Sequence, residues 1–183
     1  MRFLERYLER EVRPALGCTE PGAIAFCVSL AASKLEGKIE KVEVTTSVNV
    51  YKNGMYVGIP GTNEKGNEFA AALGAVCGDA ALQLEALRPC RIESVDLARE
   101  MIDKGLVSVT CNQDLSGVFI EALLSNQNHS ALCRIIDNHT NVVLLELDGK
   151  RASSSEKFIP FDALEFGPEE IFELSLIHIS EPT

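Results

Sequence analysis

The chain has 183 residues, about the length of one domain, and its hydrophobic content of 46% is that of a globular protein with a sizeable core. A net charge of −10 and a pI near 4.8 argue against a basic nucleic-acid-binding surface and against electrostatic attachment to an anionic membrane. No segment approaches the roughly 18 consecutive apolar residues of a membrane span, and the charged N-terminus lacks the apolar core of a signal peptide, so we expect a cytoplasmic protein.

The first part of the chain is predicted to combine two helices with a hairpin. Residues 2–12 have the apolar spacing of a short amphipathic helix, and residues 23–37 form an apolar run typical of a buried helix. Alternating apolar and polar residues predict a strand over 39–50. Asn53-Gly54 then predicts a tight turn into a second strand at residues 55–59.

The rest of the chain changes from helix patterns to strand patterns. Three helical patterns lie at residues 68–79, 81–88 and 94–105, the last with Ser94 as its expected cap and Gly105 as its stop. Four strand patterns follow, at residues 106–111, 117–125, 129–137 and 141–149. Because helices gather before a run of strands, we predict an α+β fold in which helices pack on a mostly antiparallel sheet.

Cys18 is the cysteine whose position suggests chemistry. It lies in GCTEPG, immediately before a predicted helix, where free backbone N–H groups and the helix dipole are expected to lower the pKa of a thiol. From the residues alone it is either a reactive or metal-binding thiol or a structural cysteine packed in a turn. No CxxC pair is present and disulfides are not expected in a reducing compartment, so the other five cysteines are predicted to pack in the core: Cys27, Cys77, Cys90, Cys111 and Cys133.

Two further features are candidates for a site. The glycine-bearing loop VGIPGTNEKGN precedes a helix, which suits the binding of a carboxylate or phosphate by backbone N–H groups, although such loops are also plain connections. His129 and His139 lie in predicted turns, where each is either a general base or an ordinary surface histidine.

The last ten residues, LSLIHISEPT, have the sequence of a translated sequencing adapter. We therefore expect residues 174–183 to be foreign and residues 1–173 to be the native α+β part of a protein that continues further. The alternative is a genuine short strand and tail.

The motifs EVRPALGCTEP, KNGMYVGIPGT, AAALGAVCGD and HSA…DNHTNVVLLELDGK resemble the L-cysteine desulfidase family, which is related to the alpha chain of iron–sulfur L-serine dehydratase. The resemblance extends over nearly all of residues 1–173 and implies a chain truncated before a helical C-terminal portion. It implies a fragment of a lyase that converts L-cysteine to pyruvate, ammonia and hydrogen sulfide by α,β-elimination. The alternatives are an L-serine ammonia-lyase of the same cluster type and a non-catalytic small-molecule-binding module.

The same resemblance implies a site. Cys18 would be one ligand of a [4Fe-4S] cluster whose other ligands are missing from this chain, so the fragment alone is expected to be inactive. No pyridoxal phosphate is expected. The implied partner is a small amino-acid substrate. From the charge and hydropathy we expect neither nucleic acid nor a membrane as a partner, and an apolar face left exposed by truncation would allow a homodimer. The candidate substrate-binding residues are Asn53, Gly54, Gly58, Gly61 and Thr62, and the candidate catalytic residues are Glu20, His129 and His139.

Overall fold

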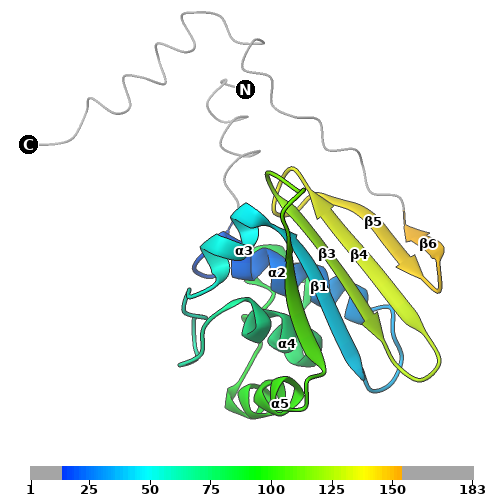
Figure 1. Ribbon diagram of the computed structural model, residues 1–183. Helices are drawn as coiled ribbons and strands as arrows, with labels where there is room; N and C mark the ends of the chain where they lie inside the picture. The colour runs from blue at the N-terminus through cyan, green and yellow to red at the C-terminus, as the bar shows by residue number, and fades with distance from the viewer. Residues whose placement is uncertain (1–13, 154–183) are drawn as a thin grey trace, which may run out of the picture. The chain divides into compact units, whose positions relative to one another are not determined.

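The computed structural model describes residues 14–153, which form a six-stranded sheet with helices on one of its faces (Figure 1). The strand order is β2-β1-β3-β4-β5-β6. The strands are β1 (Lys41–Ser47), β2 (Val107–Asn112), β3 (Phe119–Ser125), β4 (Ser130–Ile136), β5 (Val142–Leu147) and β6 (Lys150–Ser153). The helix expected at residues 2–12 and the tail expected at 174–183 lie outside the described residues.

The α2 helix is the centre of the core. It is apolar all round and is buried from Pro21 to Ser29, as expected of a helix enclosed on every side. It packs between the sheet and the other helical elements α4 and η1. The helices are α2 (Thr19–Ala32), α3 (Val48–Gly54), α4 (Asn67–Cys77), the 3-10 helix η1 (Ala80–Glu85) and α5 (Ile92–Asp103).

The strand pairing confirms the predicted α+β fold with a mostly antiparallel sheet. Only β1 and β2 pair in parallel, and the remaining neighbours are antiparallel. The parallel pair arises because a long crossover, which carries α3, α4, η1 and α5, returns the chain in the same direction. Alternate side chains of β1 and β3 form the buried inner face, such as Val44 beside Ala122.

The α2 and α4 helices approach each other closely through Gly74. A Cβ added at Gly74 would lie 2.7 Å from the backbone oxygen of Ala25, closer than a carbon and an oxygen can pack. The absence of a side chain at this position therefore sets the distance between the two helices.

The predicted hairpin at Asn53-Gly54 is wrong. The strand ends at Ser47 and the chain continues directly into α3, while residues 55–59 form no strand. A two-residue hairpin turn needs a positive φ at its central residues, and Gly54 does not have one. Gly54 instead lies against the Asn67 side chain, where an added Cβ would be 2.0 Å from Oδ1. This tertiary contact favours the helical turn over the local hairpin preference.

Two smaller expectations also differ from the structure. The α5 helix begins at Ile92 with Arg91 as its N-cap, rather than at Ser94. The pattern at 81–88 becomes the 3-10 helix η1 because Gln83 adopts a φ of 50° and interrupts it. Beyond the predicted strands, a turn at Asp148-Gly149 leads into a further strand, β6. The predicted stop at Gly105 is confirmed, with a φ of 66°.

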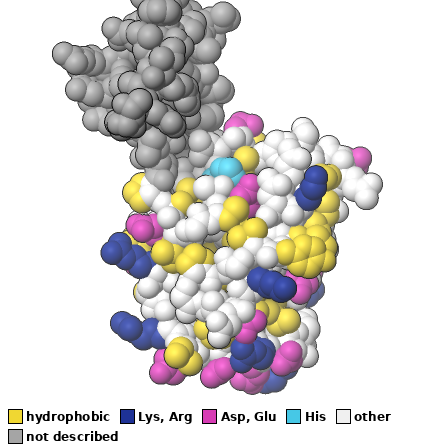
Figure 2. Space-filling model, turned by 90° about the vertical axis from the view of Figure 1, so that its left-hand side faces the viewer, with side chains coloured by type: hydrophobic (Ala, Val, Ile, Leu, Met, Phe, Trp, Pro, Cys, Tyr) yellow, Lys and Arg dark blue, Asp and Glu magenta, His cyan; other side chains and the backbone are white. Residues whose placement is uncertain are grey.

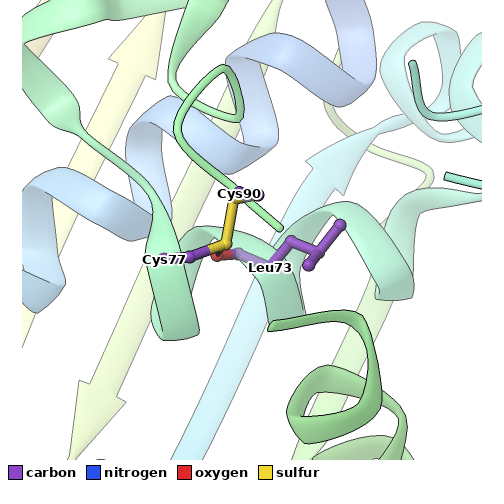
Figure 3. The surroundings of a disulfide bond; sticks show 3 residues. All are labelled: Leu73, Cys77 and Cys90. Carbon is purple, nitrogen blue, oxygen red and sulfur yellow. Dashed lines mark hydrogen bonds between the residues drawn. A yellow bond between two sulfur atoms is a disulfide. The ribbon is translucent and has the colours of Figure 1, made fainter. Parts of the chain in front are cut away.

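The cysteines divide into three environments. Cys27 and Cys133 are fully buried, which confirms core packing for these two. Cys111 is exposed on the edge strand β2, so its predicted burial is wrong. Cys77 and Cys90 form a disulfide with a Cα–Cα distance of 5.4 Å, which overturns the expectation of no disulfide (Figure 3). Spacing alone does not reveal such a pair, because folding brings the end of α4 beside the segment before α5.

Within residues 14–153, each helix is too short or too polar to cross a membrane.

Candidate functional site

Cys18 lies at the N-cap of α2 in an extended backbone conformation, with φ −72° and ψ 141°. Its side chain does not cap the helix in the usual way. The thiol instead turns towards the first helical turn, where Sγ donates a hydrogen bond to Oε2 of Glu20 at 3.0 Å. The most buried helix of the fold therefore positions this thiol and carboxylate as a pair.

Glu20 connects the start of α2 with α3. Its Oε2 also accepts a hydrogen bond from the Thr19 hydroxyl at 3.1 Å, and its Oε1 accepts one from Nδ2 of Asn53 at 3.0 Å. We call Cys18, Thr19, Glu20 and Asn53 the Cys18 cluster. The link between Glu20 and Asn53 brings together two residues that were predicted to belong to a site, and Thr19 is a member that the sequence did not indicate.

The pKa of the Cys18 thiol is raised in the structure, whereas the sequence predicted a lowered pKa. Burial, together with the hydrogen bond to Glu20, raises the pKa of the Cys18 thiol and outweighs the nearby backbone N–H groups that lower it. Burial also raises the pKa of the Glu20 carboxyl, but the hydrogen bonds from Cys18, Asn53 and Thr19 outweigh that effect and hold it below its ordinary value. The cluster thus combines a neutral thiol with an ionised carboxylate.

Only one of the two candidate histidines lies near this cluster. Burial lowers the pKa of His139, and the charge of Glu20 partly opposes that shift, which places the imidazole within electrostatic range of the carboxylate. His129 precedes β4 whereas His139 follows it, so the length of the strand separates them by roughly 20 Å. His129 pairs with Asp148, with Nδ1 2.7 Å from Oδ2, and is exposed.

The glycine-bearing loop contacts the Cys18 turn and also lines a cavity beside α5. Gly17, with a φ of 80°, lies against Pro60, since an added Cβ would be 2.7 Å from the proline ring. The Thr62 hydroxyl is used inside the loop, where it donates to the carbonyl oxygen of Ile59 at 2.8 Å and accepts from the N–H of Glu64 at 3.0 Å. Of the predicted substrate-binding residues, Asn53 therefore joins the Cys18 cluster and Thr62 does not.

The face of the loop that is turned towards α5 forms a cavity of about 370 Å³, with Gly61 and Thr62 in its lining. Arg99 of α5 also lines it and forms ion pairs with Glu64 and Asp96. Figure 2 shows this mixture of charges, with acidic and basic side chains side by side at the lower end of the molecule, at the height of α5. Because its guanidinium is already paired with two carboxylates, Arg99 is poorly suited to attract an anionic ligand.

The residues around Cys18 do not by themselves fit an iron–sulfur cluster. A [4Fe-4S] cluster is held by cysteine thiolates, and the described surroundings of Cys18 supply one thiol beside a carboxylate. Across residues 14–153, no group of three or more Cys, His, Asp and Glu side chains is arranged to hold a metal ion. The [4Fe-4S] cofactor therefore stays a prediction.

Comparison with known proteins corrects the assignment made from the motifs. The chain is 47% identical over 178 residues to a UPF0597 protein of Kosmotoga olearia, covering 93% of this chain and 42% of that protein. It is 40% identical over 160 residues to a UPF0597 protein of Caldanaerobacter subterraneus, covering 87% of this chain and 38% of that protein. A UPF0597 protein of Methanocella arvoryzae is 39% identical over 153 residues. No protein-family model and no solved structure matches the chain.

These names overturn the resemblance to L-cysteine desulfidase and to the serine dehydratase alpha chain. The relatives form a distinct family whose name states no activity, so the lyase function, the enzyme class and the iron–sulfur description are wrong as inferences from homology. The chain is similar to UPF0597 proteins over most of its own length and spans about two fifths of theirs.

Proposed function

We propose that the Cys18 cluster is the part of a small amino-acid site that this chain contributes. In this proposal, Glu20 binds the ammonium group of the ligand and exchanges a proton with the Cys18 thiol. The proposal concerns ligand binding by this part of the protein, since the UPF0597 relatives are more than twice as long as the chain.

The observation that carries the proposal is the spare acceptor capacity of Glu20. An ionised carboxylate offers about four acceptor positions, two on each oxygen. Among the described residues, Oε2 accepts from Cys18 and Thr19, whereas Oε1 accepts only from Asn53. With respect to residues 14–153, one position on Oε1 is therefore open for a charged donor, and hydrogen bonds between an ammonium group and a carboxylate are among the stronger ones in proteins.

The start of α2 offers hydrogen-bond donors for the carboxylate group of an amino-acid ligand. Pro21 has no N–H, so the N–H groups of Thr19 and Glu20 are the donors closest to the beginning of the helix. Both lower the pKa of the Cys18 thiol, which means that they face it. A ligand carboxylate beside the thiol would meet the same two donors and the positive end of the helix dipole.

The protonation states suit proton exchange with a bound ligand. The Cys18 thiol is kept neutral and directs its proton at Glu20, while Glu20 stays ionised. The lowered pKa of His139 keeps its imidazole neutral at neutral pH, so it adds a second proton acceptor within range of Glu20. The cluster thus holds a proton donor, the Cys18 thiol, against an ionised acceptor, the Glu20 carboxylate.

The test is a titration of the isotope-labelled chain with L-alanine, L-serine and L-cysteine, followed by amide chemical shifts. Propionate and ethylamine serve as probes that carry only one of the two charged groups. We expect the amino acids to shift the amide signals of Thr19, Glu20 and Gly22, and Glu20→Gln to weaken binding about tenfold or more, because the variant loses a charged hydrogen bond.

Glu36→Gln is the matched control. Glu36 is exposed beyond the far end of α2, about 20 Å from Cys18 along the helix, and its substitution removes the same charge without touching the cluster. Equal affinity of the wild type and Glu20→Gln, or shifts confined to residues outside the cluster, would refute the proposal.

A further inference from the structure

The Cys77–Cys90 disulfide closes a short segment of the chain that packs on the start of α2. Cys77 is the last residue of α4 and Cys90 precedes α5, with a sequence separation of 13 residues (Figure 3). Both residues are half-buried, so a small thiol or disulfide in solution can reach the bond. We call residues 78–90 the η1 segment, after the 3-10 helix that it contains.

The η1 segment lies directly against the turn that carries Cys18. The backbone oxygen of Leu84 accepts a hydrogen bond from the N–H of Leu16 at 3.4 Å. The same oxygen faces Gly22 in the first turn of α2, where an added Cβ would lie only 2.9 Å away. Contacts on both sides of Cys18 therefore depend on the position of Leu84.

The η1 segment needs its ends held together. Gln83 adopts a φ of 50° and a ψ of −119°, a conformation that costs free energy and persists only where the surroundings enforce it. The buried side chains of Leu84 and Leu87 anchor its middle, and a hydrogen bond from the N–H of Asp79 to the oxygen of Ala86 closes its base. The disulfide fixes the C-terminal end of the segment, at Cys90, which follows the buried leucines.

Breaking the disulfide would release the η1 segment more than α4. Sγ of Cys77 lies 3.3 Å from the carbonyl oxygen of Leu73, one helical turn earlier. A reduced Cys77 thiol can donate to that oxygen without moving, and the end of α4 keeps its structure. The Cys90 side has no such helix around it, since residues 88 and 89 are exposed.

We propose that Cys77 and Cys90 form a redox switch that sets the order of the η1 segment and, through Leu84, of the Cys18 turn. On oxidation, one thiolate attacks a low-molecular-weight disulfide such as oxidised glutathione and releases one glutathione thiol. The second thiolate then attacks the mixed disulfide, releases the other glutathione and forms the Cys77–Cys90 bond. The two cysteines lose two electrons and two protons in all, and glutathione takes them up.

The evidence for the switch is the packing of the η1 segment against the Cys18 turn. Only an effect of the switch on ligand affinity rests on the proposed function. The test is hydrogen exchange, read peptide by peptide by mass spectrometry, on the chain equilibrated in reduced or oxidised glutathione. We expect exchange in residues 14–22 and 78–90 to be on the order of tenfold faster after reduction, within the roughly hundredfold limit that closure of a loop of this length can supply. Residues 130–136 of β4 are the internal reference and should not change.

Two variants separate the disulfide from other thiol chemistry. Cys77→Ser/Cys90→Ser should exchange rapidly in both buffers, whereas Cys111→Ser, which removes an exposed free thiol, should respond as the wild type does. The comparison of oxidised with reduced wild type decides the matter even where the double variant fails to fold.

Equal exchange of residues 14–22 in the two buffers would overturn the switch, and so would six titratable thiols in the chain treated with oxidised glutathione. A chain that binds no amino acid in either buffer contradicts only the proposed function, because the exchange measurement needs no ligand.

Discussion

Glu20 determines how the Cys18 proton is shared. The carboxylate accepts the thiol hydrogen bond and carries a negative charge, and both effects raise the pKa of Cys18 in addition to its burial. The backbone N–H groups of Thr19 and Glu20 act in the opposite direction but are outweighed. Burial and the Glu20 carboxylate therefore act together to keep Cys18 a neutral thiol at the start of α2.

The first prediction is that Glu20→Gln makes Cys18 more reactive. The variant removes the charge and the strong acceptor but keeps the two backbone N–H groups, so the pKa of Cys18 should fall. Alkylation of Cys18 by iodoacetamide, followed on its own peptide by mass spectrometry, should be severalfold faster at pH 7, with the rate profile moved to lower pH. Glu36→Gln should leave the profile unchanged, and a slower reaction in Glu20→Gln would show that the pair is not coupled as described.

The position of Cys18 was predictable, whereas its protonation was not. A cysteine between Gly17 and a proline-led helix start is a local pattern, and it correctly placed Cys18 immediately before a helix. The direction of its pKa shift depends on the rotamer of Glu20 and on Asn53, which arrives from α3. That contact spans 33 residues of sequence and has no local signal.

At the scale of elements, the second prediction concerns the contact between α2 and α4. Gly74→Ala gains up to about 1 kcal/mol of helix propensity, but its Cβ would lie 2.7 Å from the backbone oxygen of Ala25, which cannot swing aside. We expect a net loss of about 1–3 kcal/mol in the free energy of unfolding, measured by urea denaturation. Gly58→Ala is the control, because its Cβ would meet no atom within 4 Å and its φ is not positive, so it should be nearly neutral.

The third prediction concerns the crosslink between the end of α4 and the η1 segment. In the chain-entropy account, a crosslink over 13 residues stabilises the folded state by about 3 kcal/mol, mainly by restricting the unfolded chain. Cys77→Ser/Cys90→Ser should lose about this amount in the free energy of unfolding under oxidising conditions. In excess reductant the wild type should drop to the same level, and a difference that persists there would point to packing rather than to the crosslink.

Periodicity predicted most elements and failed where distant residues compete with local preference. The strands β3, β4 and β5 and the helices α2, α4 and α5 correspond to patterns in the sequence. The hairpin at Asn53-Gly54 was wrong because Gly54 packs on Asn67, and the disulfide was missed because its two cysteines meet only after folding. Both failures involve contacts that no window of neighbouring residues contains.

For the molecule as a whole, the shifted groups predict a maximum of stability near neutral pH. The pKa values of Glu20, Asp148 and His139 are lower in the folded protein, so the unfolded chain binds protons more readily in acid and stability falls. The pKa of Cys18 is raised, so its contribution is present below its ordinary value of 9.0 and is lost as the pH rises through the folded value. The fall in acid should begin with His139, whose ordinary pKa of 6.5 is the highest of the three lowered groups.

The fourth prediction follows from this order. Between pH 7 and pH 5 the free energy of unfolding should decrease in the wild type, and His139→Asn should flatten that part of the curve because it removes the group that titrates there. The measurement is urea denaturation in a series of buffers. Glu36→Gln is the control, since Glu36 is exposed and lies beyond the far end of α2 from the Cys18 cluster. An equally steep decrease in His139→Asn would assign the acid sensitivity to other groups.

The parallel pairing of β1 with β2 has a consequence for how the chain reaches this structure. The antiparallel neighbours from β3 to β6 are joined by short turns and can pair as soon as they are adjacent. By contrast, β1 finds β2 only across the whole crossover, with Val42 opposite Val107, and finds β3 at still greater separation, with Lys41 opposite Ser125. Long-range pairing of this kind slows folding. We therefore expect the addition of β1 to the sheet to be the step that limits the folding rate of the domain.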